Sequence, residues 1–304
     1  MLKKYLVVGA GIIGSSIAKE IRRRNLGDVL VIEKEKELGL HASGRNSGVI
    51  HSGINQFPGS LKSKFCVEGS RRLREYCVEN GVPMNECGTV VVARDRREEA
   101  TLYSVLGMGM ELGVEGLKIV GETQLGELEP SIKAKKALIS PTGAVVDSQR
   151  LLESVLQDAI GLGAEYKYGE EVLNVERGVL VTNKGEYTGH VVNCAGLYAD
   201  KLAHKFGIGL EYSIVPFRGE YFEVNASVSS MVYQAPDLRY PFLGVHFTKS
   251  INGKVLAGPS AVLSIGRKSY KKEIDFNETF DMIGSSNFWK MVMSREFLSL
   301  AAHN

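Results

Sequence analysis

The chain has 304 residues, of which 44% are hydrophobic and 24% are charged, so it is long enough to bury the cores of two domains. Its net charge of +2 and its short basic runs fit solvated surfaces, and we expect no nucleic-acid partner. No apolar stretch approaches the roughly 18 residues that a membrane-spanning helix needs. The four cysteines form no C-x-x-C pair, which argues against a metal site and fits a reducing compartment. Because the first predicted strand leaves no room for a presequence, we expect a cytoplasmic protein.

The start of the chain predicts a dinucleotide-binding turn. Residues 3–8 have the apolar character of a short buried strand, and they lead directly into Gly9-Ala10-Gly11-Ile12-Ile13-Gly14. Gly9 permits the tight turn, Gly11 lets the backbone approach a pyrophosphate, and Gly14 lets the following helix pack against the strand. The beginning of that helix then directs N–H groups and a partial positive charge at the phosphates.

An acidic residue follows at the expected distance. Helical spacing continues to Arg24, and a second apolar strand at residues 29–32 ends in Glu33, which lies 19 residues after Gly14. A carboxylate at this position accepts ribose hydroxyls and repels a 2′-phosphate, which favours FAD or NAD over NADP. Strand, turn, helix, strand and acid fall in register, so a plain surface turn is the weaker interpretation. We also assign Lys34, beside Glu33, to the cofactor site.

Residues 38–53 are rich in Gly, Ser and His and predict a loop that lies close to a flat polar ligand. The glycines let the backbone approach the ligand, and the polar side chains between them supply hydrogen-bond donors. An ordinary surface loop is the alternative. The residues that we expect to contact the cofactor are Ser43, Gly44, Arg45, Asn46, Ser47 and Gly48.

Helices and short strands alternate through the middle of the chain, as in an α/β protein. The predicted helices cover residues 62–80, 98–112, 121–128 and 148–162, and the predicted strands cover residues 88–94, 171–176 and 179–182. We assign Val172, on the second of these strands, to the cofactor site.

A second strand-to-glycine turn follows. An apolar strand at residues 187–193 meets Cys194-Ala195-Gly196, which opens a predicted helix at residues 198–206. Nicotinamide enzymes need one fingerprint of this kind, whereas flavoproteins of the two-dinucleotide type bring a second strand end under the same cofactor. The pair of turns therefore favours FAD over NAD.

From Ser213 onward the pattern changes to strands with polar interruptions, at residues 214–224, 242–248 and 254–257. Asn252-Gly253 predicts a hairpin turn with both residues at positive φ. We therefore expect an α/β fold: a two-dinucleotide-type, Rossmann-like FAD-binding domain at residues 1–87 and 141–212, and a discontinuous α+β substrate domain built on an antiparallel sheet at residues 88–140 and 213–304.

Four sequence blocks carry a resemblance to a known family. The first runs from His41 to Gly53 with Pro58-Gly59-Ser60-Leu61-Lys62 after it, and the others are residues 192–197, residues 215–221, and residues 241–248 with 258–263. Together they resemble the L-2-hydroxyglutarate dehydrogenase/oxidase family, a branch of the D-amino-acid-oxidase-like flavoproteins. The resemblance implies bound FAD, oxidation of (S)-2-hydroxyglutarate, which is a small dicarboxylate hydroxy acid, and electron transfer to a quinone or to oxygen. It leaves peripheral membrane association and a homo-oligomer open.

Hydride removal from such a substrate needs a base for the hydroxyl proton and cations for the carboxylates. His51 is the candidate base because imidazole titrates near working pH, and Arg218 is the candidate for bidentate carboxylate binding. Tyr221 and His246 are candidates to complete the pocket. The alternative for each is a structural role: a backbone-bonded histidine, an exposed ion pair, or a core side chain.

The chain also departs from the family pattern. Asn55 and Gln56 replace two tyrosines, and Lys268-Ser269 replaces Glu-Gly before Tyr270. Asn304 ends the chain sooner than the resemblance leads us to expect, and residues 276–304 predict helices that pack on the substrate domain. A shortened chain would hold FAD weakly, self-associate and turn over slowly. The remaining alternatives are a flavin amine oxidase, a glycerol-3-phosphate dehydrogenase-like enzyme, or a FAD-binding protein with little activity of its own.

Overall fold

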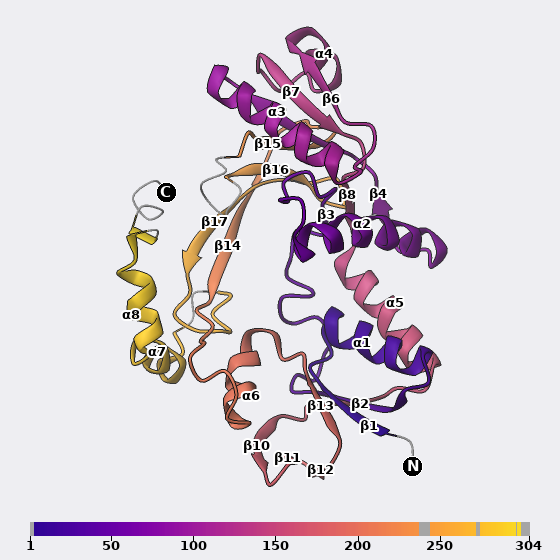
Figure 1. Ribbon diagram of the computed structural model, residues 1–304, viewed down its shortest axis with the longest axis vertical. Coiled ribbons are helices and arrows are strands. Elements are labelled where there is room, and N and C mark those ends of the chain that lie inside the picture. The colour runs from indigo at the N-terminus through magenta and orange to yellow at the C-terminus, as the bar shows by residue number, and fades with distance from the viewer. Residues whose placement is uncertain (1–2, 237–243, 272–273, 296, 299–304) are drawn as a thin grey trace. The chain divides into compact units, whose positions relative to one another are not determined.

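The computed structural model describes residues 3–236, 244–271, 274–295 and 297–298 (Figure 1). The described chain divides into two compact units. Unit 1 comprises residues 1–46, 149–218 and 263–304, and unit 2 comprises residues 47–148 and 219–262. The mixed α/β fold that the sequence predicts is confirmed.

Unit 1 is built on a parallel sheet of four strands in the order β13-β1-β2-β9. The strands are β1 (Lys3–Val8), β2 (Gly27–Glu33), β9 (Glu165–Tyr168) and β13 (His190–Asn193). Val7 and Val31 are fully buried, as expected of parallel strands that are covered on both faces. The carboxyl ends of β1 and β2 therefore carry the first fingerprint turn and Glu33 to one edge of the sheet.

Different elements cover the two faces of this sheet. Ala18 of α1 (Ile12–Arg23) and Ala159 of α5 (Ser148–Gly161) share one core with Val7 and Val31. Figure 1 shows both helices on the same side of β1 and β2. The other face packs against a three-stranded antiparallel sheet and a short helix. These elements are β10 (Val172–Glu176), β11 (Val179–Thr182), β12 (Glu186–Tyr187) and α6 (Ala199–Lys205), which follows the short 3₁₀ helix η1 (Gly196–Tyr198).

Unit 2 is built on a mixed sheet of seven strands in the order β14-β17-β16-β15-β5-β7-β6. Only the β15–β5 pairing among the described registers of this sheet is parallel. The strands are β5 (Thr89–Ala93), β6 (Lys118–Gly121), β7 (Lys136–Ser140), β14 (Phe217–Val224), β15 (Met231–Gln234), β16 (His246–Lys249) and β17 (Val255–Leu263). Two stretches that lie more than 70 residues apart in the chain thus share one sheet.

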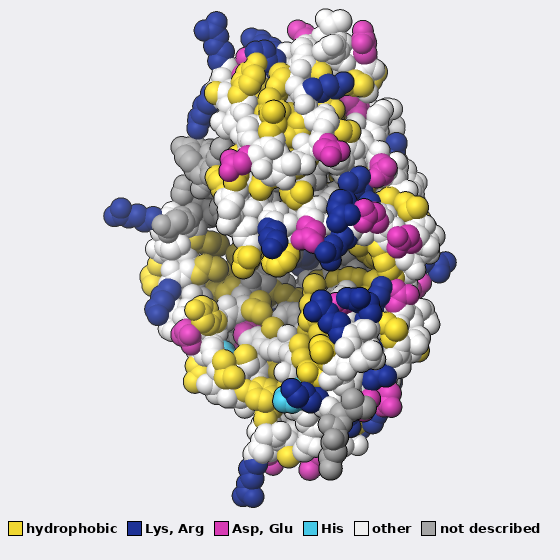
Figure 2. Space-filling model, turned by 45° about the vertical axis from the view of Figure 1, so that its right-hand side comes forward, with side chains coloured by type: hydrophobic (Ala, Val, Ile, Leu, Met, Phe, Trp, Pro, Cys, Tyr) yellow, Lys and Arg dark blue, Asp and Glu magenta, His cyan; other side chains and the backbone are white. Residues whose placement is uncertain are grey.

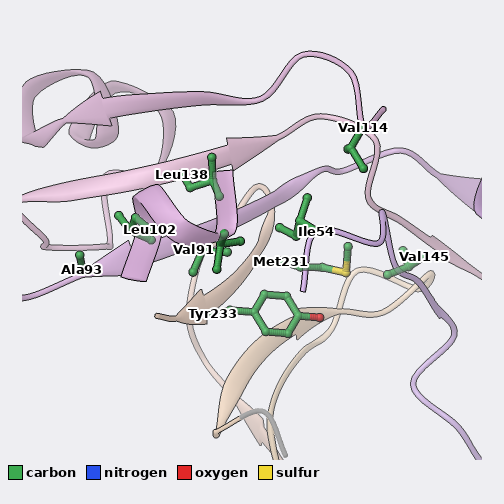
Figure 3. Close-up of a cluster of buried hydrophobic side chains, with 10 residues drawn as sticks. Ile54, Val91, Ala93, Leu102, Val114, Leu138, Val145, Met231 and Tyr233 are labelled. Atoms are coloured by element: carbon green, nitrogen blue, oxygen red, sulfur yellow. The ribbon is translucent and has the colours of Figure 1, made fainter. Parts of the chain in front are cut away.

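The sheet of unit 2 separates two cores, because alternate side chains of a strand point to opposite faces. Val91 and Tyr233 pack with Leu102 of α3 (Arg96–Glu111) on one face, shown in Figure 3. Val90 packs with Leu125 of α4 (Glu122–Leu128) on the other. The remaining elements are α2 (Leu61–Glu79) and the small sheet β3 (Val49–Ile50), β8 (Ala144–Val146) and β4 (Met84–Asn85).

Charged side chains of both signs share the molecular surface. On the face that Figure 2 shows, Lys and Arg side chains are interspersed with Asp and Glu side chains. Arg71 and Glu75 of α2, for example, are 2.7 Å apart and more than half exposed. Such exposed pairs contribute at most about 1 kcal/mol each, so they indicate a solvated surface more than a source of stability.

The compact units differ from the predicted domain boundaries in four segments. Residues 141–148, predicted in the FAD-binding domain, lie in unit 2, and residues 213–218, predicted in the substrate domain, lie in unit 1. Residues 47–87, predicted to belong with residues 1–46, lie in unit 2, because β3 and β4 pair with β8 and Ile54 enters the core of Figure 3. Residues 263–304, predicted to pack on the substrate domain, lie in unit 1. This segment forms helices α7 (Phe276–Ile283) and α8 (Ser286–Val292). Asp281 of α7 forms an ion pair with Lys201 of α6.

Three local predictions also need correction. The strand expected from residue 214 begins at Phe217, and the strand expected at residues 187–193 is divided between β12 and β13. Of the strand expected at 242–248, residues 242–243 lie outside the described residues. The hairpin between β16 and β17 is confirmed, but only Gly253 has a positive φ, of 85°. Asn252 does not need that conformation, because Ser250 and Lys254 close a longer loop.

Candidate functional site

The first fingerprint turn is shaped by contacts that only glycine permits. Gly9 has a φ of 108°, and a Cβ atom there would lie 2.4 Å from the Cys194 carbonyl oxygen. A Cβ atom on Gly14 would lie 1.9 Å from the Gly9 carbonyl oxygen. Gly11 is the N-cap residue of α1, and the nearest atom to a Cβ there is the Ser43 hydroxyl at 2.9 Å. Gly9 and Gly14 therefore allow close packing of the backbone, whereas Gly11 leaves the N-terminal end of α1 free of a side chain.

Glu33 and Ser43 hold this turn in place. The Glu33 carboxylate accepts hydrogen bonds from the backbone N–H of Ala10 at 2.8 Å and of Glu35 at 2.9 Å. The Ser43 hydroxyl accepts a hydrogen bond from the N–H of Ile12 at 3.0 Å, so one of the N–H groups in the first turn of α1 has a partner. A carboxylate has about four lone-pair positions, so Glu33 retains the capacity to accept hydroxyl groups from a ligand.

The second turn lies beside the first. The N–H of Cys194 donates to the Val8 carbonyl at 2.9 Å, which continues the parallel pairing of β1 and β13 past the strand ends. Ala195 and Gly196 follow, and Gly196 begins η1. The two glycine-containing turns therefore meet at the carboxyl edge of one sheet, where ligands of open α/β sheets bind.

A cavity of about 670 Å³ opens at this edge within unit 1. Its volume falls in the ordinary range of small-molecule sites. The predicted residues that line it are Gly9, Gly11, Ile12, Ile13, Glu33, Lys34, Ser43, Asn46, Val172, Cys194, Ala195 and Gly196. Lining residues that the sequence analysis did not assign include Glu35, His41, Tyr198, Lys201, Lys205 and Glu278.

Five predicted cofactor residues do not line the cavity. Gly14 packs under the turn, and Gly44 approaches the Gly39 carbonyl so closely that a Cβ would lie 2.1 Å from it. Arg45 uses its Nε to hold the Leu40 carbonyl at 2.7 Å. Ser47 and Gly48 belong to unit 2, where Gly48 pairs with Val146. These residues fix the conformation of the loop. The sequence could not distinguish residues that fix the loop from residues that contact the cofactor, because both roles require glycine and small polar side chains.

The cavity wall carries a coupled group of charges next to Glu33. Burial lowers the pKa of Lys34 to about 8, helped by the nearby charge of Lys268, and the Lys34 ammonium lies 3.2 Å from the centre of the Tyr198 ring. Burial tends to raise the pKa of Glu35, but hydrogen bonds from Lys268 and His41 outweigh it and bring that pKa to about 2. At neutral pH this part of the wall therefore holds Glu35 as an anion and most of Lys34 as a cation.

Unit 2 brings together three of the four predicted catalytic residues. His246 pairs with Gly258 of β17, and its ring stacks on Tyr233 of β15 with centroids 4.3 Å apart. Tyr221 of β14 covers Gly258, where an added Cβ would lie 2.7 Å from the tyrosine ring. The centroid of the His51 ring lies 6.3 Å from that of Tyr233. The sequence did not identify Tyr233 as a site residue, because a tyrosine in an otherwise apolar strand looks like an ordinary core residue.

Both histidines are shifted toward the neutral form. Surrounding protein lowers the pKa of His51, and the charges of His246 and Lys62 lower it further, although the His51 side chain keeps solvent-exposed surface. Burial lowers the pKa of His246, whose Nδ1 lies 2.9 Å from the Gly244 carbonyl oxygen. A carbonyl only accepts, so Nδ1 carries the proton and Nε2 presents its lone pair.

Arg218, the fourth predicted catalytic residue, lies in unit 1. Its NH1 group donates to the Ser269 carbonyl at 2.8 Å. Arg218 and Tyr221 are three positions apart on β14, so the alternation of a regular strand directs them to opposite faces. A second cation that sequence reasoning missed is Lys62, at the start of α2, whose charge acts on His51. The Pro-Gly-Ser-Leu-Lys block that contains Lys62 was the available signal.

The described part of the chain contains neither a helix that could span a membrane nor a candidate metal site. No helix there is long and apolar enough to cross a membrane. Within the same residues, no group of three or more His, Cys, Asp and Glu side chains is placed to hold a metal ion.

Comparison with known sequences finds a family and several relatives. Residues 4–283 match the DAO family, described as FAD dependent oxidoreductase. The L-2-hydroxyglutarate dehydrogenase of Indibacter alkaliphilus is 36% identical over 98% of this chain and 79% of its own length. The mitochondrial L-2-hydroxyglutarate dehydrogenase of Mus musculus is 36% identical over 94% of this chain and 66% of its own length. The Escherichia coli K12 enzyme of the same name is 33% identical, with coverages of 95% and 71%.

Comparison with solved structures finds the same fold in other flavoproteins. The FAD-bound L-α-glycerophosphate oxidase of Mycoplasma pneumoniae superposes with a TM-score of 0.73 at 24% identity, over 88% of this chain and 73% of that one. Glycine oxidase of Geobacillus kaustophilus gives a TM-score of 0.72 at 20% identity, over 86% of this chain and 72% of that one. At these identities the likeness concerns the fold alone.

Proposed function

The chain belongs to the DAO family of FAD-dependent oxidoreductases and to its L-2-hydroxyglutarate dehydrogenase branch, and from this premise we propose that it oxidises (S)-2-hydroxyglutarate to 2-oxoglutarate. The observation that carries the proposal is the 36% identity to a dehydrogenase of that name over 98% of the chain, because the match includes unit 2 as well as the cofactor unit. We further propose a quinone or oxygen as the electron acceptor.

FAD fits the residues that surround the cavity of unit 1. The cavity is large enough for a dinucleotide to occupy in part, Gly11 leaves the entrance of α1 open, and Glu33 can accept ribose hydroxyls. We propose that Gly11 and the first turn of α1 face the pyrophosphate, that Lys34 and Val172 flank the adenosine, and that Ala195-Gly196 supports the same cofactor. FAD, when bound, accepts a hydride from C2 of the substrate at its N5 atom.

Residues of unit 2, together with Arg218 of unit 1, would handle the substrate's proton and charge. We propose His51 as the base that takes the hydroxyl proton, because its ring has exposed surface and its lowered pKa keeps it neutral at pH 7. His246 and Tyr221 would orient the substrate beside Gly258, the glycine that pairs with His246 and lies against the Tyr221 ring. Arg218 and Lys62 are the proposed partners of the two carboxylates.

The direct test of this proposal is anaerobic mixing of the holoprotein with one equivalent of (S)-2-hydroxyglutarate. The expected result is bleaching of the visible FAD absorbance together with one equivalent of 2-oxoglutarate, identified by mass. The R enantiomer at the same concentration is the control. Bleaching by the R enantiomer alone, or an unchanged spectrum with both enantiomers, would refute the proposal.

Replacement of Arg218 tests carboxylate binding. We expect Arg218→Ala to raise KM by roughly 10- to 100-fold, from the loss of charge-assisted hydrogen bonds of about 1.5–3 kcal/mol. Arg218→Lys should restore only part of the affinity, because lysine lacks the planar fork of arginine. Steady-state kinetics of both variants give the answer, with Arg150→Ala, an exposed arginine of α5, as the control. An unchanged KM in Arg218→Ala would return Arg218 to a structural role and favour Lys62.

The pH dependence of FAD binding tests Lys34. In the protein without FAD, Lys34 loses its proton near pH 8 instead of near 10.5. An anionic ligand binds the protonated form more tightly, so FAD affinity should be constant below pH 8 and fall as the pH rises through that value. Fluorescence titrations between pH 6.5 and 9.5, chosen to bracket the pKa, measure this. Lys34→Met should bind FAD more weakly and without the decline, and a decline that persists in this variant would assign it to another group.

A further inference from the structure

Residues 264–270, which follow β17, contact the second turn of the cofactor cavity and the loop after β2 through side chains that were given no role from the sequence. All of these contacts lie within unit 1. Arg267 reaches the second turn, at Leu197 and Asp200. Lys268 and Tyr270 reach Glu35 and His41, at the end of β2 and in the loop after it.

Arg267 holds the second turn by a buried ion pair. Its NH1 and NH2 groups lie 2.5 Å and 2.8 Å from the two oxygens of Asp200, and the side chains are only 11% and 6% exposed. NH1 also donates to the carbonyl of Leu197, the residue after Gly196. One guanidinium group therefore joins the end of the glycine turn to the first turn of α6.

Asp200 is the centre of this arrangement. Its carboxylate also accepts hydrogen bonds from the N–H of Ile214 and of Lys201, both at 2.8 Å. Burial tends to raise the pKa of Asp200, but the bonds from Arg267, Ile214 and Lys201 outweigh it, so the pKa lies below its ordinary value. Without Arg267, this charge would be buried without a cation of its own, which is a strongly unfavourable state.

The backbone of Arg267 adds a second connection to the cavity wall. Its N–H donates to one oxygen of Glu278 at 2.5 Å, and the other oxygen accepts the Tyr198 hydroxyl at 2.8 Å. Tyr198 and Glu278 both line the cavity. Arg267 thus connects three parts of the wall: the glycine turn, α6, and α7.

The neighbouring residues make similar contacts with the part of the cavity wall that follows β2. Lys268 Nζ lies 2.8 Å from Glu35, and Tyr270 exchanges a hydrogen bond of 2.9 Å with His41, whose other ring nitrogen lies 2.9 Å from Glu35. The guanidinium of Arg45 lies 4.3 Å from the centre of the Tyr270 ring. Residues 267–270 therefore connect the second glycine turn with the part of the cavity wall that Glu35 and His41 provide.

We propose that Arg267 is a positioning residue of the FAD site, which fixes the Ala195-Gly196-Leu197 turn through the Leu197 carbonyl and Asp200. A buried ion pair of this kind adds little net stability but selects one geometry, since both partners must be correctly placed to offset their loss of hydration. The selected geometry here is that of the cavity wall. This role concerns retention of FAD and is independent of which hydroxy acid is oxidised.

The test compares FAD binding with the stability of the protein without FAD. FAD is removed from wild-type protein and from Arg267→Gln, Arg267→Lys and Asp200→Asn, and the dissociation constant is measured by quenching of flavin fluorescence. We expect Arg267→Gln to weaken FAD binding by about tenfold or more, because the Asp200 charge loses its partner and the turn is released. Arg267→Lys should restore part of the affinity, since one ammonium group cannot hold both Asp200 oxygens and the carbonyl.

Two further variants make the result specific. The double variant Arg267→Gln with Asp200→Asn should weaken FAD binding clearly less than the product of the two single effects, because the two residues act as one unit. Lys19→Met removes another ion pair of unit 1, that with Asp158 at 2.6 Å, away from the cavity, and should leave FAD affinity unchanged.

The outcomes decide between positioning and general support. If Arg267→Gln lowers the melting temperature of the FAD-free protein while its dissociation constant for FAD stays within about twofold of wild type, Arg267 supports the fold only and the proposal is wrong. An equal loss of FAD affinity in Lys19→Met would also overturn it. Asp200→Asn keeps the shape of the aspartate, so it provides the answer if Arg267→Gln does not fold.

Discussion

Replacement of His51 by alanine is expected to lower kcat by roughly 10²- to 10⁴-fold, the usual contribution of a general base. FAD should remain bound, because His51 lies in unit 2 and the cofactor cavity is formed by residues of unit 1. The pH profile adds a second test. Because the protein lowers the pKa of His51 from the ordinary 6.5 of imidazole, the fall of kcat/KM on the acid side should come at a lower pH than an ordinary histidine would give.

His246→Ala is the matched control for this variant. His246 is nearly buried and stacks on Tyr233, so its loss should disturb substrate affinity and stability more than the proton-transfer step. If His51→Ala retained wild-type kcat with FAD bound while His246→Ala lost it, the base would be His246, acting through Nε2. If both variants kept wild-type kcat, neither histidine would be the base.

Gly11→Val is expected to weaken FAD binding enough to lower the FAD content of the purified protein. Gly11 lines the cavity at the entrance of α1, so the valine side chain would occupy the space that the pyrophosphate needs. A side chain forced into an occupied space typically costs about 1–3 kcal/mol, which corresponds to a loss of affinity of roughly 10- to 100-fold. The ratio of flavin absorbance to protein absorbance after purification measures the FAD content.

Gly161→Val provides the control in the same unit. Gly161 ends α5, lies outside the cavity, and has no atom within 4 Å of an added Cβ. This variant should purify with wild-type FAD content. Wild-type FAD content in Gly11→Val would show that the cofactor does not approach α1 in the expected way.

The nucleotide-binding half of the fold was predictable because its signals are local. Residues 3–33 contain strand, turn, helix and strand in immediate succession. The close contacts that require Gly9, Gly14 and Gly27 lie within this stretch or with the second turn. The same holds for the Asn252-Gly253 hairpin, although its detailed turn geometry depends on how Ser250 and Lys254 close the loop. The local sequence pattern thus predicted the hairpin correctly but not the φ angle of Asn252.

The remaining parts of the site depend on contacts between distant residues. Arg267 meets Asp200, 67 positions earlier, and Lys268 meets Glu35 from still farther away. Nothing in the periodicity around residue 267 indicates these partners, and for that reason residues 263–304 were predicted to pack on the other domain. Tyr233 was missed for a related reason: a buried tyrosine beside two histidines looks, in sequence, like any strand residue of a core.

The most direct test of the proposed activity is a comparison of kcat/KM for a panel of substrates with an electron-accepting dye. The holoprotein is assayed with both enantiomers of 2-hydroxyglutarate, and with lactate, malate, glycine and glycerol-3-phosphate. We predict that (S)-2-hydroxyglutarate gives the highest kcat/KM, because the match to dehydrogenases of this substrate covers both units. A higher kcat/KM for glycine or glycerol-3-phosphate, or no turnover of any substrate by protein with full FAD content, would contradict the account.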